Sequence, residues 1–139
     1  MAYDDMNVFA QILRGEIPAM KILETDQALA FLDVMPQSKG HALVIPKAAS
    51  ENLLSADPSI FGPLLAMVQQ VGQAAMAAFD ADGIVVQQLN HSAAGQTVFH
   101  THFHVIPRYE GVPLKPHTGE MADADVLAEC ASAYKAQLG

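Results

Sequence analysis

Three histidines that alternate with other residues, His100, His102 and His104, are the feature of the chain best suited to chemistry. Successive side chains on a β-strand point to opposite faces, so a strand over residues 98–106 would place all three imidazoles on one face. The intervening aromatic and aliphatic side chains would then face the core. A neutral imidazole can attack phosphorus and form a covalent intermediate, and neighbouring imidazoles can carry protons near pH 7. The pattern therefore indicates nucleophilic catalysis.

Two other interpretations of these histidines are open. A single strand histidine is usually a packing or surface residue, but three in register contribute nothing obvious to packing. Two histidines separated by one residue can also chelate zinc. However, the α-carbons of His100 and His104 would lie ~13 Å apart on a strand, and the neighbouring sequence supplies no cysteine or carboxylate to complete such a site. We therefore predict neither a metal site nor a cofactor.

The residues before the histidines supply groups suited to a phosphate. Gln96 and Thr97 offer an amide, a hydroxyl and backbone N–H groups, and Asn90 offers a second amide. Donors of these kinds stabilise phosphoryl oxygens. We expect them on a polar, glycine-containing loop over residues 90–96 and at the start of the histidine strand.

Hydrophobic periodicity predicts the elements that must position these residues. Apolar side chains at steps of three and four predict a long helix over residues 59–79. Asn7 is suited to cap a short helix over residues 8–15, and a last helix is expected over residues 123–138. Short apolar runs bounded by turns predict strands at residues 20–24, 28–32, 41–45, 84–89 and 98–106. The order predicts an α+β fold, a five-stranded antiparallel sheet with one long packed helix.

Length and composition predict one domain. The chain has 139 residues, of which 51% are hydrophobic and 16% charged, so we expect a single domain with its core at about 7–110 and an extension over 111–139. The net charge of −8 disfavours nucleic acids and anionic membranes as partners. Cys130 is the only cysteine, which excludes an internal disulfide. No signal-like segment and no run of ~20 apolar residues is present, so we expect a cytoplasmic protein.

The histidine run also resembles a known family signature. Residues 100–106 match the His-φ-His-φ-His-φ-φ pattern of the histidine triad (HIT) superfamily of nucleotide hydrolases and transferases. Residues 7–18, 31–37 and 40–47 resemble further blocks of its Hint branch, in the form found in bacteria. The resemblance covers about residues 7–110, and it implies a homodimer in which two sheets join into one.

The resemblance implies a catalytic role for four histidines. His102 would attack the α-phosphorus of a nucleotide and become a nucleotidylated imidazole, which water then cleaves. His104 and His41 would hold phosphoryl oxygens and the geometry of the nucleophile, and His100 would assist orientation and proton transfer. The remaining two histidines, at positions 91 and 117, have no such counterpart and are predicted to be loop residues.

The resemblance also implies the substrate contacts. Asn90, Gln96 and Thr97 would bind the phosphate and leaving group, and Asp33 would accept hydrogen bonds from the ribose hydroxyls. Taken singly, Asp33 and the histidine at position 41 are typical turn residues, so the joint match alone gives them these roles. The residues expected to hold the base are Val8, Phe9, Phe31, Leu32 and Val34.

The sequence departs from its relatives at informative positions. Met6 and Phe9 stand where many bacterial relatives carry the Cys-x-x-Cys of a structural zinc site, so we expect that site to be absent. Leu32 stands where many Hint-type proteins have a histidine.

The predicted function is hydrolysis of purine nucleoside 5′-phosphoramidates or related nucleoside monophosphate conjugates. The alternatives are a dinucleoside polyphosphate hydrolase of the Fhit type and a nucleotide-binding or scaffold protein with incidental hydrolysis.

Overall fold

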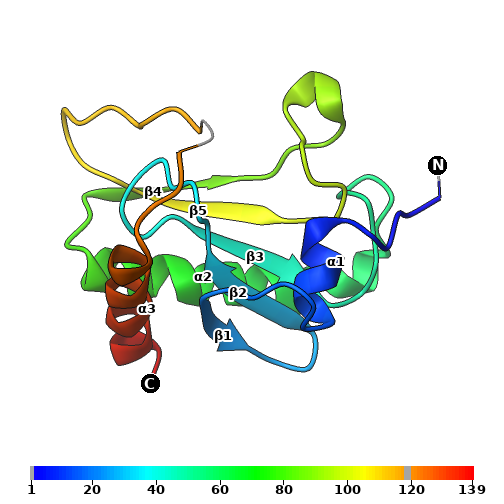
Figure 1. The fold of residues 1–139 in the computed structure, drawn as a ribbon, viewed down its shortest axis with the longest axis horizontal. Coiled ribbons are helices and arrows are strands. Elements are labelled where there is room, and N and C mark those ends of the chain that lie inside the picture. The colour runs from blue at the N-terminus through cyan, green and yellow to red at the C-terminus, as the bar shows by residue number, and fades with distance from the viewer. Residues whose placement is uncertain (1, 118–119) are drawn as a thin grey trace.

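Five strands form one antiparallel sheet in the order β1-β2-β3-β5-β4, which confirms the predicted fold class (Figure 1). The computed structural model describes residues 2–117 and 120–139. The strands are β1 (Lys21–Glu24), β2 (Ala28–Leu32), β3 (Ala42–Pro46), β4 (Gly83–Gln87) and β5 (Phe103–Arg108). The neighbours β2 and β3 pair along their whole lengths, from Ala28 opposite Pro46 to Leu32 opposite Ala42. This pair forms the rigid centre of the sheet.

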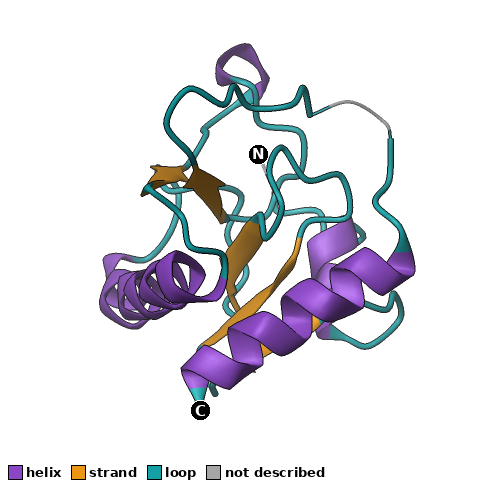
Figure 2. Ribbon diagram, turned by 90° about the vertical axis from the view of Figure 1, so that its left-hand side faces the viewer, coloured by secondary structure: helices purple, strands orange, loops and turns teal. Residues whose placement is uncertain are grey.

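Three α-helices cover the sheet, α1 (Val8–Leu13), α2 (Phe61–Ala78) and α3 (Ala124–Leu138). The side-chain oxygen of Asn7 accepts a hydrogen bond from the backbone N–H of Ala10 at 2.9 Å, which confirms the predicted cap of α1. Helices α2 and α3 lie against one face of the sheet (Figure 2), and α1 packs on the other. None of the helices in the described residues is both long and apolar enough to span a membrane.

The central strands are buried on both faces because helices cover both. In β2, Ala28, Ala30 and Leu32 belong to the apolar cluster on the α2 and α3 side. Leu29 and Phe31 alternate with them and join the cluster on the α1 side. Period-two alternation therefore divides one apolar run between two cores.

The predicted strand over residues 98–106 is wrong in its first half. Strand β5 begins only at Phe103, so His104 lies in the sheet while His100 and His102 lie before it. The pairing explains this. The ladder with β3 stops at Val44 opposite Phe103, although β3 itself continues to Pro46, and β4 ends at Gln87 opposite His104. Instead, the N–H of Thr101 donates to the carbonyl of Ser50 at 2.9 Å. The three imidazoles are buried, at 0%, 5% and 8% exposure, and do not form an outward-facing row.

Pro107 lies inside β5, beyond the predicted end of the strand at residue 106. Strand β5 continues to Arg108, and Pro107 pairs with Ile84 of β4. Pairing with β3 ends earlier, at Val105 opposite Ala42, so at Pro107 the strand has a neighbour on one side only. A proline is tolerated where one edge of a strand is unpaired.

The loop between β2 and β3 is anchored from both sides by aromatic residues. The hydroxyl of Tyr134 in α3 donates a hydrogen bond to the carbonyl of Gly40. The ring of Tyr134 packs edge-on against Phe79, with ring centres 5.1 Å apart. Gly40 has a φ of +91°, a conformation that L-residues rarely adopt. Gly40 thus allows the backbone conformation that the loop adopts directly before His41.

Gly40→Ala is expected to destabilise the protein by at least ~2 kcal/mol, because it combines a strained φ with a steric clash. A β-carbon at this position would lie within 2.5–2.9 Å of the Phe79 ring, which Tyr134 prevents from moving freely. Gly72→Ala is the matched control, since its β-carbon would meet nothing within 4 Å in the middle of α2, and it should stabilise by ~0.5–1 kcal/mol. Urea denaturation measures the free energy of unfolding of both variants. Equal stability of the two would contradict the requirement for glycine at position 40.

Candidate active site

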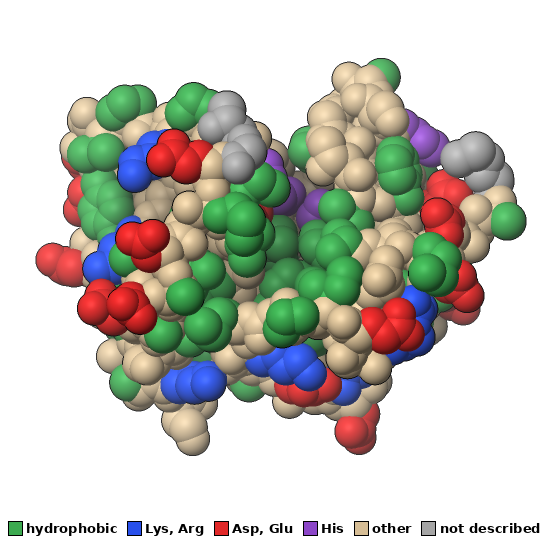
Figure 3. Space-filling model, viewed as in Figure 1, with side chains coloured by type: hydrophobic (Ala, Val, Ile, Leu, Met, Phe, Trp, Pro, Cys, Tyr) green, Lys and Arg blue, Asp and Glu red, His purple; other side chains and the backbone are tan. Residues whose placement is uncertain are grey.

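A pocket of about 260 Å³ opens on the α1 face of the sheet. Figure 3 shows a hollow on this side of the molecule, lined by hydrophobic side chains, with histidines at its inner end. The apolar lining includes Val8, Phe9, Ile12, Ile17, Phe31, Leu43 and Val98. The polar lining consists of Asp33, Thr97, His102, His104 and His117. An apolar cavity with a few converging polar groups is the usual form of a small-molecule site.

His102 presents an unprotonated nitrogen to this pocket. Its Nδ1 lies 2.6 Å from the carbonyl oxygen of His100, and because a carbonyl can only accept, Nδ1 carries the hydrogen. The neutral ring therefore has its lone pair on Nε2. The Phe9 ring meets the imidazole edge-on, with centres 4.9 Å apart, and limits its rotation. His102 is thus oriented as a nucleophile.

A relay of hydrogen bonds fixes the neighbouring imidazoles in the complementary form. The backbone N–H of Gln37 donates to Nδ1 of His41 at 3.1 Å, so the hydrogen of neutral His41 is on Nε2. That Nε2 lies 2.9 Å from Nδ1 of His104 and donates to it. His104 therefore carries its own hydrogen on Nε2. Since His104 lines the pocket, it can donate a hydrogen bond to a phosphoryl oxygen.

Burial keeps this network neutral. Desolvation, reinforced by the neighbouring His104 and His117 rings, lowers the pKa of His41 to about 3. Desolvation and the neighbouring His102 and His117 lower the pKa of His104 to about 4. Burial also lowers the pKa values of His100 and His102. The imidazoles are consequently uncharged near pH 7, and a neutral imidazole is the form that can act as a nucleophile.

His100 supports the nucleophile from outside the pocket. Its Nε2 donates to the carbonyl of Pro46 at 2.8 Å, and its Nδ1 accepts from the hydroxyl of Tyr3 at 2.6 Å. Both ring nitrogens are therefore engaged within the protein, and neither is available to a metal. The carbonyl of His100 is the group that orients His102.

Asp33 is buried at the edge of the pocket and contacts two histidines. Its Oδ1 accepts the N–H of Met35 at 2.8 Å, and its Oδ2 accepts Nε2–H of His117 at 3.0 Å. Nε2 of His41 lies 3.5 Å from the same Oδ2. The carboxylate is thus held in a fixed orientation toward the pocket.

The donor atoms of Asp33, His41 and His104 lie within 4.8 Å of one another, close enough in principle to share a metal ion. The hydrogen-bond network argues against this use. A ligating histidine normally donates its second ring N–H to an acceptor, whereas Nδ1 of His41 accepts from the N–H of Gln37. The donor set is therefore built for hydrogen bonding, and the absence of a metal site stays a prediction.

The structure does not bring two of the predicted phosphate-binding residues into the pocket. The amide of Gln96 is fully used, accepting from Asn52 and from the N–H of His91 and donating to the carbonyls of Glu51 and Val98. Asn90 accepts from the N–H of Leu53 and exchanges hydrogen bonds with Gln88. Both amides instead hold the loops around the site.

All five predicted base contacts, Val8, Phe9, Phe31, Leu32 and Val34, line the pocket. Leu32 differs from the others because its side chain also belongs to the core cluster on the opposite face of the sheet, since it alternates with Phe31 along β2. Among the predicted phosphate contacts, Thr97 does line the pocket.

Two residues of the site were not predicted from the sequence. His117, which was predicted to be a loop residue, lines the pocket and contacts Asp33. Tyr3 holds His100 across 97 positions of sequence. No local sequence pattern predicts the role of either residue, because each acts through a contact with a residue that is distant in the sequence.

An α+β fold in which buried imidazoles line an apolar pocket is the arrangement of the histidine triad class of proteins. The HIT domain model matches residues 14–111. The chain accordingly belongs to the HIT family, in its Hint-like branch.

Solved and curated relatives agree with this assignment. A Hit-like protein of Bartonella henselae is 46% identical, with a TM-score of 0.93, over 99% of this chain and 100% of that one. Adenylylsulfatase HINT3 of Arabidopsis thaliana is 41% identical over 74% of this chain and 52% of its own length. Adenosine 5′-monophosphoramidase hnt1 of Schizosaccharomyces pombe is 40% identical over 73% of both chains. This chain thus spans about half the length of the plant relative.

The free energy of unfolding should fall as the pH falls from ~6.5 to ~5. The pKa values of His41 and His104 are about 3 and about 4 in the folded state against 6.5 ordinarily, so over this range the unfolded chain binds more protons. Each such histidine adds up to ~1.4 kcal/mol per pH unit to the slope. Urea denaturation at several pH values measures it. His41→Asn should have a shallower slope, and a flat profile for the unaltered protein would contradict the neutral network.

Proposed function

We propose that the protein hydrolyses nucleoside 5′-monophosphate conjugates, with purine nucleoside 5′-phosphoramidates as the representative substrates. The single observation that carries the proposal is the unprotonated Nε2 of His102, held at the polar end of an apolar pocket by the carbonyl of His100. This nitrogen is a nucleophile without need of a metal or a cofactor.

The reaction would proceed in two balanced steps. In the first, Nε2 of His102 forms a bond to the α-phosphorus as the bond from phosphorus to the leaving group breaks. The leaving group departs with the bonding electrons and takes up a proton from solvent. In the second, water attacks the same phosphorus and loses a proton to solvent as the bond between phosphorus and Nε2 breaks, which releases the nucleoside monophosphate and restores the imidazole. His104 would donate Nε2–H to a phosphoryl oxygen as its charge develops.

The walls of the pocket match the parts of such a substrate. Phe9 and Phe31 lie edge to face with centres 5.5 Å apart and form an apolar surface for a purine. Asp33 lines the same pocket and contacts His117 and His41, and it would accept the ribose hydroxyls. Thr97 also lines the pocket and is available to the phosphate or the leaving group.

The names of the relatives support adenylate conjugates as the substrate class. One is named an adenylylsulfatase and another an adenosine 5′-monophosphoramidase. Both names describe an adenylate that carries a leaving group. The net charge of −8 favours a substrate with one phosphate and an amine leaving group over a highly anionic polyphosphate.

A substrate panel tests the proposal. Adenosine 5′-phosphoramidate, adenylyl sulfate, diadenosine polyphosphates and simple phosphate esters should be compared by kcat/KM in the presence of a chelator. We expect the phosphoramidate to be hydrolysed fastest. Preference for the polyphosphates would favour the Fhit-type alternative, and nucleotide binding without turnover of any member would favour a binding protein.

His102→Ala should lower the rate by ~10³-fold or more, as loss of a nucleophile generally does. Nucleotide binding should survive, because the apolar walls and Asp33 are unchanged. His91→Asn is the matched control, since His91 is an exposed loop histidine outside the pocket lining, and it should retain activity. Single-turnover kinetics and calorimetry measure the two effects, and near-normal turnover by the alanine variant would refute the assignment of the nucleophile.

We also propose that the protein is a homodimer joined along β4. Among the described residues, β4 has β5 as its one strand neighbour, so its outer edge is unpaired, and Val86 on this strand is 50% exposed. Such an edge invites pairing with a second copy. Light scattering should give twice the chain mass of 14.8 kDa, and Val86→Lys should weaken association. A 14.8 kDa species at micromolar concentration would contradict the dimer.

A further inference from the structure

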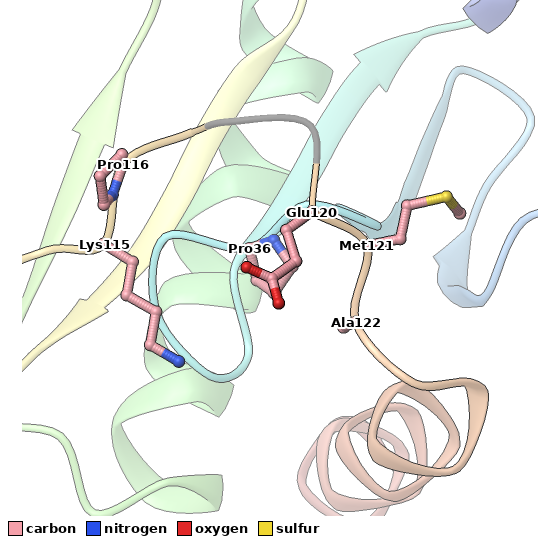
Figure 4. A pocket seen from close by; sticks show the side chains of 6 residues that line it. All are labelled: Pro36, Lys115, Pro116, Glu120, Met121 and Ala122. Atoms are coloured by element: carbon pink, nitrogen blue, oxygen red, sulfur yellow. The ribbon is translucent and has the colours of Figure 1, made fainter.

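The chain after β5 returns to the loop between β2 and β3 as a segment that we call the C-terminal strap, residues 113–117 and 120–123 (Figure 1). It is attached to the loop between β2 and β3 by backbone hydrogen bonds. Lys115 donates its N–H to the carbonyl of Gln37, and Ala122 donates to that of Val34, both at 2.9 Å. Figure 4 shows Lys115 and Pro116 on one side of Pro36 and Met121 and Ala122 on the other. The strap and the loop thus hold each other in place.

This attachment places His117 at the junction of the proposed ribose and phosphate positions. Its ring centre lies 5.8 Å from that of His41 and 6.2 Å from that of His104. Its Nε2 lies 3.0 Å from Oδ2 of Asp33. The side chain of His117 is 34% exposed, whereas that of Asp33 is 7% exposed. His117 therefore covers a buried carboxylate and also forms part of the pocket wall.

His117 and Met35 together orient the carboxylate of Asp33 and leave two of its acceptor positions free. A carboxylate has about four lone-pair positions, two on each oxygen. The N–H of Met35 occupies one on Oδ1, and Nε2–H of His117 occupies one on Oδ2. One position on each oxygen is left, and two vicinal hydroxyls require two acceptors. The two donors thus fix the plane of the carboxylate while leaving the number of acceptors that a ribose needs.

We propose that His117 is a positioning residue for the ribose, which orients the carboxylate of Asp33 and makes the C-terminal strap part of the nucleotide site. This inference rests on the proposed function, since it names the residue that sets the sugar preference of the same pocket. The strap does not depend on the imidazole, because backbone groups attach it on both sides of His117. Removal of the side chain should therefore affect the carboxylate and leave the strap in place.

Binding of AMP and of 2′,3′-dideoxy-AMP, measured by calorimetry, tests the proposal. Asp33→Ala should weaken AMP binding by at least ~10-fold, since hydrogen bonds to a charged group are lost. His117→Ala should weaken it by ~3–10-fold, because the carboxylate loses its orientation while keeping its charge. Neither variant should change dideoxy-AMP binding, because that ligand has no hydroxyls to lose.

Two further variants separate positioning from a structural role. His117→Gln offers an N–H at a similar reach and should restore much of the AMP affinity. In the Asp33→Ala background, His117→Ala should have no additional effect, since the residue acts through Asp33. Lys115→Ala is the matched control on the strap, because its hydrogen bond to Gln37 uses the backbone, and it should bind both ligands normally.

The outcomes are decisive. Equal losses for AMP and dideoxy-AMP in His117→Ala, or additive losses in the double variant, would overturn the positioning role. An unaltered protein that binds neither ligand would refute the inference together with the proposed function. If the expected pattern of binding is found while no nucleotide conjugate is hydrolysed, the inference stands and the hydrolase proposal fails.

Discussion

The backbone decides which nitrogen of each active-site histidine carries a hydrogen, and the rest of the site depends on that choice. The carbonyl of His100 places the hydrogen of His102 on Nδ1 and thereby exposes its Nε2 lone pair. The N–H of Gln37 donates to Nδ1 of His41 and so places the hydrogen of His41 on Nε2. That N–H donates to Nδ1 of His104, so the hydrogen of His104 is also on Nε2. A nucleophile and a donor, made from the same type of side chain, thus stand side by side with ring centres 5.1 Å apart.

This division works only because the imidazoles stay neutral. A protonated histidine has two donors and no lone pair, so protonation of His102 would remove the nucleophile. Burial provides the protection, because desolvation disfavours the charged form of each ring. The burial of these imidazoles is therefore a chemical requirement of the site. Asp33 brings a negative charge nearby, and the hydrogen bonds from Met35 and His117 satisfy it.

The sequence predicted the parts of the molecule that depend on local pattern. Apolar runs between turns predicted the strands, and apolar residues at steps of three and four predicted the long helix. The spacing of the triad indicated the resemblance from which His102 is predicted to be the nucleophile. The pattern could not show that residues 98–102 leave the ladders of β3 and β4, because the point where two strands stop pairing is a property of the sheet. The same reasoning placed Asn90 and Gln96 on phosphate, since an amide suits a loop and a ligand equally well. The role of His117 could not be predicted from local sequence, because its partner Asp33 is 84 positions away.

The site is assembled from nearly the full length of the described chain, from Tyr3 to His117. Its hydrogen bonds join residues separated by 63, 84 and 97 positions. During synthesis, the triad can acquire its complete set of partners only after residue 117 has left the ribosome. Segments near the ends of a chain also open at lower free-energy cost than a central sheet. A cell protease that trimmed the first residues through Tyr3 would therefore remove a partner of His100 and leave the sheet folded, so the site would become incomplete before the structure was lost.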